Sequence, residues 1–355
     1  MSLDSNPITT ASLAKPYHIK ANQFERAYKD HLSGFSDWEE AEHAEDWLIF
    51  PRNIGPRVSI DETSLSNGEL YTIVANKDGH ARQGTLIALV KGTKADDVVA
   101  ALNRIDATLR DKVTEITMDF SDTMEAIATA CFPKAEIIVD RFHAQKLAYD
   151  AMQEIRMEEK RAAAKEEARL KKEFKKRKEQ QLKRRKAKKD KKDNRGRKPT
   201  RKNEAYVPFR HSNGDTKVEL LTRSRYLLMV SADKWTESQK QRAAILFENH
   251  PRIQQAHSLA HSLRVRYSMK YEDPILGFES IRSWIKEARE SAIEAFSTVA
   301  DTMEDKFSNV IKYFDNRASN AFAESLNAKI KDFRARLKGV SDIKFFLYRV
   351  SLIFG

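Results

Sequence analysis

The stretch VSIDETS, residues 58–64, runs from a β-forming start directly into two adjacent carboxylates, Asp61 and Glu62. An apolar start of this kind predicts a buried strand. Successive side chains of a strand point to opposite faces of the sheet, so only one of the two carboxylates can face a given neighbouring strand. The stretch therefore predicts a buried strand that ends at a charged site.

Strand and helix signals follow the quoted stretch in a fixed order. Three β-rich runs are separated by turn signals and predict an antiparallel meander, at residues 57–63, 69–78 and 83–92. Helix and strand patterns then alternate, at residues 94–105, 113–121, 122–132 and 135–143. The order βββαβαβ, followed by a helix, is that of the ribonuclease-H-like fold, in which the first strand lies centrally beside the fourth. The predicted fold class is α/β, with a mixed sheet and flanking helices.

The charge of the chain is concentrated in one segment. Its 355 residues carry a net charge of +12, with a pI of about 9.5, which favours a polyanionic partner such as nucleic acid. Residues 156–202 hold 24 Lys and Arg against 8 Asp and Glu, so the rest of the chain is slightly acidic. This run predicts a solvated helix followed by a disordered basic loop, and it is compatible with neutralising phosphates.

Cysteine content and hydropathy exclude several classes of protein. The single cysteine, Cys131, excludes a disulfide framework and a Cys-rich zinc site and favours a reducing compartment. The N-terminus has no apolar leader, and no run approaches the ~18 apolar residues of a membrane span. We therefore expect an intracellular protein with no membrane contact.

Two carboxylates are expected to meet on neighbouring strands. Asp61 lies on the first strand and Asp119 at the end of the fourth. If these strands are adjacent, the carboxylates face each other across a strand spacing of about 4.8 Å. Such a pair would repel and would be held by hard divalent cations. Two plainer readings stay open, because Glu62 could face the site instead of Asp61, and Asp119 could merely end its strand.

A third carboxylate, Glu324, lies on a predicted helix near the C-terminus. Helical spacing puts polar Asn320 and Asn327 on its side of the helix and apolar residues on another side. Glu324 could equally be a plain surface residue. The same helix carries four basic residues that read as a solvated face or as a DNA-facing surface: Lys329, Lys331, Arg334 and Arg336.

Four motifs resemble the DDE transposases of bacterial insertion sequences, specifically the ISL-three family. They are IDE at 60–62, MDFS at 118–121, VDRFH at 139–143 and SNAFAESLNAKIKDFRARLKG at 319–339. The resemblance covers roughly residues 55–150 and 310–355. It implies a DNA transposase that cleaves and transfers the strands of an insertion sequence, located in the bacterial cytoplasm at the nucleoid.

The resemblance also assigns roles to individual residues. It implies that Asp61, Asp119 and Glu324 are the catalytic, metal-binding triad, and it selects Asp61 over Glu62. Two Mg²⁺ ions, with Mn²⁺ as an alternative, would activate the nucleophile and stabilise the leaving oxygen. Asp140 and His143 match a D-x-x-H pair carried by such families. They are expected to support the site, as is Asn327, although Asp140 could simply cap the following helix.

The expected domain organisation is a split catalytic core. A helical lead-in at 1–54 precedes the first part of the core at 55–150, a helical insertion fills 151–310, and the last part follows at 311–355. Relatives commonly begin with a zinc-binding, end-recognising region that this sequence lacks, which implies a separate end-recognition polypeptide or a truncated element. The implied partners are transposon ends, target DNA and further copies of the chain.

Two other functions stay open from the sequence. The first is a non-catalytic, transposase-derived protein whose basic segment binds DNA. The second is a ribonuclease-H-like nuclease for RNA or branched DNA, which would share the three carboxylates. Substrate preference separates these functions, and the residues alone do not specify it.

Overall fold

The protein is described by a computed structural model that covers residues 2–66, 69–189, 205–340 and 342–355. These residues fall into two compact units. Unit 1 comprises residues 1–144, 271–279 and 302–355, and unit 2 comprises residues 145–270 and 280–301. Residues 190–204 lie outside the described residues. They include the end of the basic segment 156–202, where the sequence predicts a disordered loop.

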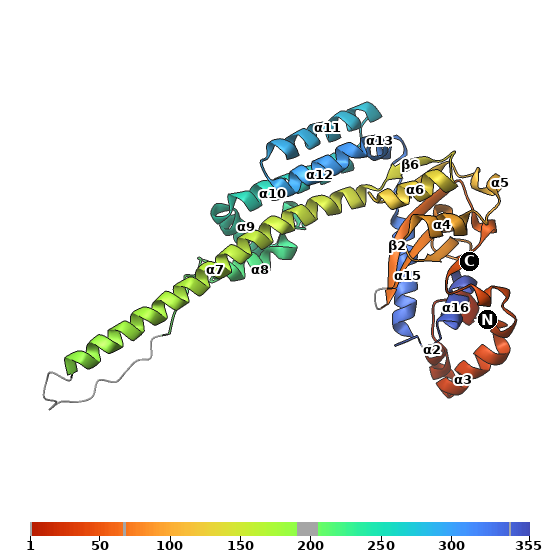
Figure 1. Cartoon of the computed structure of the whole chain (residues 1–355), viewed down its shortest axis with the longest axis horizontal. Helices are drawn as coiled ribbons and strands as arrows, with labels where there is room; N and C mark the ends of the chain where they lie inside the picture. The colour runs from red at the N-terminus through yellow and green to blue at the C-terminus, as the bar shows by residue number, and fades with distance from the viewer. Residues whose placement is uncertain (1, 67–68, 190–204, 341) are drawn as a thin grey trace. The chain divides into compact units, whose positions relative to one another are not determined.

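Unit 1 is built around a six-stranded mixed sheet with the strand order β1-β4-β3-β2-β5-β6 (Figure 1). The strands are β1 (Trp47–Ile49), β2 (Arg57–Ser66), β3 (Glu69–Asn76), β4 (Leu86–Lys91), β5 (Glu115–Met118) and β6 (Glu136–Val139). Strand β2 is antiparallel to β3 and parallel to β5, and β5 is parallel to β6. The predicted meander and the central position of the quoted strand are confirmed. The edge strand β1 was not predicted.

Helices cover both faces of this sheet. One apolar cluster joins the strands to α4 (Ala95–Leu102) and α6 (Asp122–Cys131). The other joins them to α15 (Ala321–Arg336) and α16 (Ile343–Phe354). Strand β3 supplies both clusters by alternation, with Val74 in the first and Ile73 in the second. Helix α15 is thereby held against the sheet, and it contacts β2.

Short helices complete unit 1. They are α1 (Ser2–Ser5), α2 (Thr10–Ala14), α3 (Ala21–Ala27), α5 (Ala107–Arg110), α13 (Phe307–Ile311) and α14 (Tyr313–Asn316). The helices of the N-terminal region are tied to α16 by a buried arginine. Arg349 Nη2 donates to the carbonyl oxygen of Leu3 at 2.5 Å, and Arg349 is only 3% exposed. The N-terminal residues therefore belong to the same compact unit as the sheet.

Strand β2 continues past the carboxylates and ends at Ser66, three residues beyond the predicted end at residue 63. Its antiparallel pairing with β3 continues through Asp61↔Ile73 to Ser66. Its parallel pairing with β5 is shorter and covers residues 57–59. The last pair is Ser59 with Thr117, so the register continued by two residues would bring Asp61 opposite Asp119, just beyond the end of β5.

The described secondary-structure elements of unit 2 are all helices. The unit holds α7 (Arg141–Lys189) from residue 145 on, α8 (Lys217–Leu227), α9 (Glu237–Asn249), α10 (Pro251–Ser268), and most of α11 (Pro274–Glu290) and α12 (Glu294–Asp305). Apolar residues at helical spacing form its core, among them Leu221, Leu246 and Trp284. None of the described helices has the length and apolar character needed to cross a membrane.

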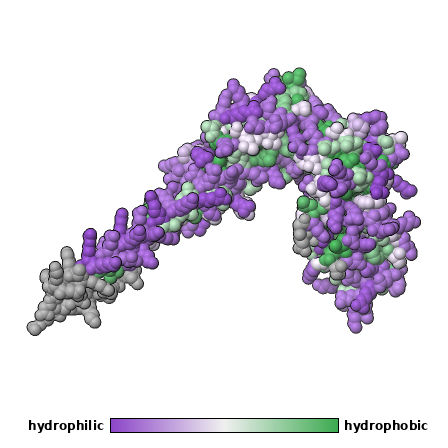
Figure 2. Space-filling model, viewed as in Figure 1, coloured by the Kyte–Doolittle hydropathy of each residue, from purple (hydrophilic) through white to green (hydrophobic). Residues whose placement is uncertain are grey.

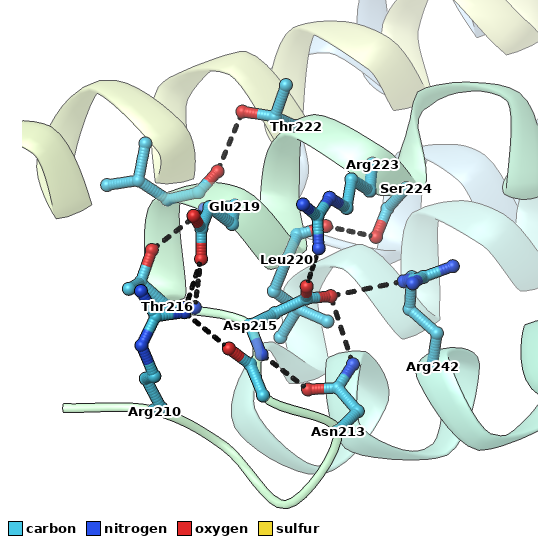
Figure 3. A network of polar contacts seen from close by, with 12 residues as sticks. Arg210, Asn213, Asp215, Thr216, Glu219, Leu220, Thr222, Arg223, Ser224 and Arg242 are labelled. Atoms are coloured by element: carbon cyan, nitrogen blue, oxygen red, sulfur yellow. Dashed lines mark hydrogen bonds and ion pairs between the residues drawn. The ribbon is translucent and has the colours of Figure 1, made fainter.

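A buried carboxylate fixes the start of α8 in unit 2. Asp215 is 1% exposed and accepts hydrogen bonds from Arg223 and, at 3.2 Å, from Arg242 Nε (Figure 3). Thr216 caps α8, and its capping box is closed by Glu219. These arginines are therefore committed to contacts inside unit 2.

Candidate active site

Asp61 is held between the sheet and α15. Asn327 Nδ2 donates to Asp61 Oδ2 at 2.6 Å, and the backbone N–H of Glu62 donates to Oδ1 at 2.8 Å. Burial raises the pKa of Asp61, and the charge of Asp119 raises it further, whereas the charge of His143 opposes the shift. The ionised form of Asp61 is therefore costly here, and positive charge would stabilise it.

Glu62 has a different environment from Asp61. It is exposed, and among the described residues its carboxylate makes no hydrogen bond to α15. Its neighbour Ile60 belongs to the apolar cluster on the face opposite α15, and alternation puts Glu62 on that same face. Partial burial and the charges of Asp119 and Asp61 raise the pKa of Glu62. Glu62 therefore lies near the site without the contacts that fix Asp61.

Asp119 lies in the connection between β5 and α6. The backbone N–H of Ser121 donates to Asp119 Oδ1 at 2.8 Å, which forms a tight turn. Ser121 in turn caps α6 by accepting from the N–H of Met124. Asp119 is half-buried, and its charge acts on Asp61. The turn fixes one carboxylate oxygen of Asp119 at the end of β5.

Two carboxylates and an imidazole come together where β6 meets α7 and where α15 begins. Asp140, His143 and Glu324 each offer one ligand atom, and these atoms lie within 4.8 Å of one another. Asp140 follows β6 and is 1% exposed, His143 lies in the first turn of α7, and Glu324 lies in the first turn of α15. Asp61 and Asp119 are not part of this close group.

The three grouped residues share an electrostatic environment with Asp61. Burial raises the pKa of Asp140, while the N–H of Phe142, 3.3 Å from Oδ1, and the charge of His143 oppose the shift. Burial also raises the pKa of Glu324, and the charges of Asp140 and Asp61 add to it. The group and Asp61 therefore belong to one site in which negative charge is in excess.

Buried polar atoms surround this group. His143 Nε2, Asn327 Oδ1 and both side-chain amide atoms of Asn320 have no hydrogen-bond partner among the described residues. Asn320 is fully buried, and its backbone N–H bonds Asp140. Leaving such an atom unpaired costs about 1–3 kcal/mol. The surroundings are therefore arranged for a polar or charged ligand. The residues alone indicate Asn320 and Asn327 by their helical spacing from Glu324, and the resemblance adds a supporting role for Asn327.

Two of the four basic residues of α15 are engaged within unit 1. Lys329 Nζ donates to the carbonyl oxygen of Ala81 at 2.8 Å. Arg334 Nη2 lies 3.3 Å from Glu69 Oε2. These side chains contribute to holding α15 on the sheet.

The other two basic residues of α15 face outward. Lys331 is exposed, and its charge acts on Asp61. Arg336 is also exposed and pairs along the helix with Asp332 at 2.7 Å. Lys331 is therefore a cation that lies close to the site and remains accessible from outside.

Sequence reasoning missed a buried ion pair in unit 1. Lys77 Nζ lies 2.6 Å from Glu115 Oε1 and donates to Thr117 Oγ1 at 2.7 Å. Both charged side chains are almost completely buried. The available signal was Glu115 itself, a charged residue opening an otherwise apolar strand, which requires a buried partner. Its partner is 38 residues away, and spacing alone does not identify it.

Comparisons with known proteins agree with these observations. A family model described as a transposase, of the DDE ISL3 (ISL-three) type, matches residues 58–207 and 200–350. The chain is similar to a transposase for insertion sequence element IS1557 in two strains of Mycobacterium tuberculosis, CDC 1551 / Oshkosh and ATCC 25618 / H37Rv. Each is 25% identical over 298 residues, which are 83% of this chain. The chain spans 58% of the length of these relatives. No solved structure matches it significantly.

Proposed function

Because this chain belongs to the family of DDE transposases of the ISL3 type, we propose that it cleaves and transfers the DNA strands of an insertion sequence. The observation that carries the proposal is the site in unit 1. Its carboxylates come from β2, from the ends of β5 and β6, and from α15, all within the range matched by the family. Carboxylates gathered in this way suit metal-dependent phosphodiester chemistry.

We take the sheet of unit 1 as a ribonuclease-H-like core that is interrupted in sequence by unit 2. Support comes from the central strand β2, which has an antiparallel neighbour on one side and a parallel neighbour on the other. Further support comes from α15, which returns to β2 after the residues of unit 2. We take this interruption as the helical insertion expected at 151–310, although unit 2 itself comprises residues 145–270 and 280–301.

The donor atoms of the site suit divalent cations. Carboxylate oxygens are the hard ligands that Mg²⁺ takes in proteins. The ligand atoms of Asp140, His143 and Glu324 lie within 4.8 Å of one another, so small side-chain movements would bring them to one ion. An imidazole nitrogen favours transition metals over Mg²⁺. We therefore expect Mn²⁺ to support the site at least as well as Mg²⁺.

We propose that Asp61, Asp119 and Glu324 are the catalytic ligands, and that Asp140 and His143 are ligands as well as supports. When bound, two such ions would supply the stabilisation of the attacking and leaving oxygens of phosphodiester displacement. The accumulated negative charge and the raised pKa values of Asp61, Asp140 and Glu324 support this proposal. Each carboxylate is a hard oxygen donor placed where bare negative charge is unfavourable.

Asn327 has a positioning role in this proposal. Its amide holds Asp61 Oδ2 and fixes the orientation of the carboxylate, while burial of Asn327 fixes the amide itself. Groups that orient metal ligands in this way typically contribute about 10- to 100-fold to metal affinity or activity. Exposed Lys331 is suited to contact a DNA phosphate next to the site, and Arg336 extends the basic surface. Lys329 and Arg334 would support that surface from within the fold.

The experiment that tests the proposal is a cleavage and strand-transfer assay on labelled duplexes that carry the inverted repeats flanking the gene. With Mg²⁺ or Mn²⁺, the protein is expected to cut at the repeat ends and to join them to target DNA. Asp61→Asn and Glu324→Gln are expected to abolish both products. Full activity of either variant would refute its residue assignment.

The same assay separates the other functions. DNA binding with no cleavage in either metal would support a non-catalytic DNA-binding protein. Preferential hydrolysis of RNA–DNA hybrids, without dependence on the repeats, would support a nuclease.

We further propose that the protein works as a homo-oligomer on paired transposon ends. Light scattering of the chain with one-end and two-end duplexes tests this proposal. A strictly monomeric complex on paired ends would refute it.

A further inference from the structure

Helix α7 changes character along its length within unit 2. Up to Ala163 one stripe of the helix is buried, including Ala148, Met152 and Ile155. Between residues 164 and 184 no described side chain is buried. Figure 1 shows this distal part extending beyond α8 and α9, and Figure 2 shows its surface as hydrophilic. The distal part of α7 therefore has almost no core of its own to stabilise it.

The distal part of α7 is densely basic on all sides. Residues 169–189 hold 13 Lys and Arg against 2 Glu. Four of them, residues 175–178, are consecutive, and at about 100° per residue they surround most of the helix. A helix that lay on a flat anionic surface would need its charge on one face only. Charge on every side instead suits a partner that surrounds the helix.

Few of these cations are neutralised within the protein. Arg169 and Lys171 have acidic partners along the helix, at 3.9 Å and 2.9 Å. Among the described residues, the following have no acidic partner: Lys172, Lys175, Lys176, Arg177, Lys183 and Arg184. The contrast within unit 2 is clear, because Arg223 and Arg242 both bind the buried Asp215 (Figure 3). The free cations of α7 are therefore available to an external polyanion.

Like charges four residues apart, as in Lys171 and Lys175 or Lys172 and Lys176, destabilise a helix. An isolated helix is also marginal in water when no tertiary packing supports it. Binding to a polyanion would relieve the repulsion and stabilise the same helix. The marginal stability of this helix and its positive charge therefore both indicate a polyanionic ligand.

We propose that residues 169–184 of α7 form a DNA-binding helix that lies in the major groove of a duplex and contacts phosphates on both walls. The B-DNA major groove is about 12 Å wide and admits an α-helix of about 10–12 Å diameter. The 16 residues span about 24 Å, or roughly seven base pairs. Contacts made by lysine and arginine to phosphates do not read sequence, so the binding is independent of sequence.

Two other polyanions fit less well. The major groove of A-form RNA is too deep and narrow to admit side chains in this way. A membrane surface requires an amphipathic helix with a broad apolar face. The distal part of α7 has three large apolar residues, Leu170, Phe174 and Leu182, and Phe174 packs on Tyr206 at a ring-centroid distance of 5.9 Å. Duplex DNA therefore matches the helix best. This inference deepens the proposed transposase function by naming where unit 2 holds DNA.

Fluorescence anisotropy of the full chain on a 20-base-pair duplex of unrelated sequence, without divalent metal, tests the proposal across a salt series. The test variant combines Lys175→Gln, Lys176→Gln and Arg177→Gln, which keep good helix formers in place. The logarithm of the binding constant falls with the logarithm of salt by about 0.9 per phosphate contact. We expect the slope to fall by about 1–3 and the affinity at about 0.1 M salt to fall 10- to 100-fold.

A matched control removes three exposed charges elsewhere in unit 2: Lys234→Gln, Lys240→Gln and Lys286→Gln. This variant is expected to bind like the wild type. Glu173→Gln with Glu179→Gln is expected to bind more tightly and with a steeper slope. An equal loss in test variant and control, or no gain on removing the two glutamates, would overturn the proposal. Tighter binding of the wild type to duplex RNA than to duplex DNA would also overturn it.

The outcome is separable from that of the catalytic proposal. Asp61→Asn is expected to retain wild-type anisotropy while it loses cleavage. The α7 variant is expected to weaken binding while cleavage at saturating DNA is retained. Each proposal can therefore fail without the other.

Discussion

Unit 1 and the distal part of α7 place charge in opposite ways. In unit 1 the carboxylates of the site are wholly or partly buried, and they are drawn from segments that lie far apart in the sequence. In α7 the lysines and arginines are exposed and contiguous. A buried charge must have a partner, and its removal is felt individually, whereas exposed charges act collectively. Single substitutions should therefore matter greatly in unit 1 and little in α7.

The largest expected effect follows from Asp61→Asn. A metal-bound carboxylate helps to stabilise the charge of the transition state. This stabilisation is worth several kcal/mol, so its removal corresponds to a rate loss of about 10³-fold. The matched control is Glu62→Gln on the adjacent, exposed residue, for which we expect a rate within about threefold of the wild type. Single-turnover cleavage at saturating DNA measures both. Equal losses in the two variants would show that the site does not discriminate Asp61 from Glu62.

Buried and exposed ion pairs within unit 1 provide the next test. Lys77→Met removes the ammonium that faces buried Glu115, and we expect the free energy of unfolding to fall by about 3–5 kcal/mol. Lys134→Met removes an exposed cation that lies 2.7 Å from Asp111, with an expected cost of about 0–1 kcal/mol. Urea denaturation measures both.

A second substitution distinguishes charge from packing at Lys77. Replacing Glu115 by leucine in the Lys77→Met background should restore much of the lost stability, because the uncompensated buried charge is removed. If the double variant is as unstable as the single one, packing of the lysine stem and not the charge explains the loss.

The sequence was sufficient where structure follows from local patterns. The three meander strands and the two helices after them follow from periodicity and turn residues, and all are present at 57–131. Helix α7 follows from its charge-dense, Gly-free run. The last residues of β2, 64–66, do not follow, because they adjoin a turn signal and their pairing with β3 depends on the partner strand.

The composition of the site depended on packing and was harder to predict. Asp140 and His143 are predicted as supports, and their ligand atoms are grouped with Glu324. That grouping arises because Leu326, Ile330 and Phe333 pack α15 onto the sheet. In the sequence, α15 follows the residues of unit 2 and is therefore distant from residue 140. No local pattern at residue 140 contains this information. The family resemblance supplied the residues, and the tertiary contacts supply their proximity.

The next prediction concerns Asp140 and the pH dependence of stability. Burial raises the pKa of Asp140 and Glu324, so the folded state favours their protonated forms. Without metal, the stabilisation from these groups is complete below their ordinary pKa values of about 4 and is lost as pH rises through the raised values. Asp140→Asn should therefore raise the metal-free Tm at pH 7, and the gain should disappear at about pH 4.

Metal should reverse this dependence. At a Mn²⁺ concentration 100 times Kd, binding stabilises the protein by about 2.7 kcal/mol, which corresponds to roughly 5–10 °C in Tm. We expect this increase in the wild type at pH 7 and only a small increase in Asp140→Asn, as measured by differential scanning fluorimetry. An equal Mn²⁺-induced shift in both proteins would exclude Asp140 as a ligand.

The smallest expected effect is that of a single lysine in α7. Lys175→Gln should leave the urea midpoint unchanged, because the side chain is exposed and has no acidic partner among the described residues. Its DNA affinity should fall by less than about tenfold at 0.1 M salt, since one phosphate contact changes the salt slope by about 0.9. The loss of affinity should shrink as salt rises, because the release of counterions then favours binding less. A salt-independent loss from Lys175→Gln would instead mean that this lysine makes a specific, individually important contact, as the carboxylates of unit 1 are expected to do.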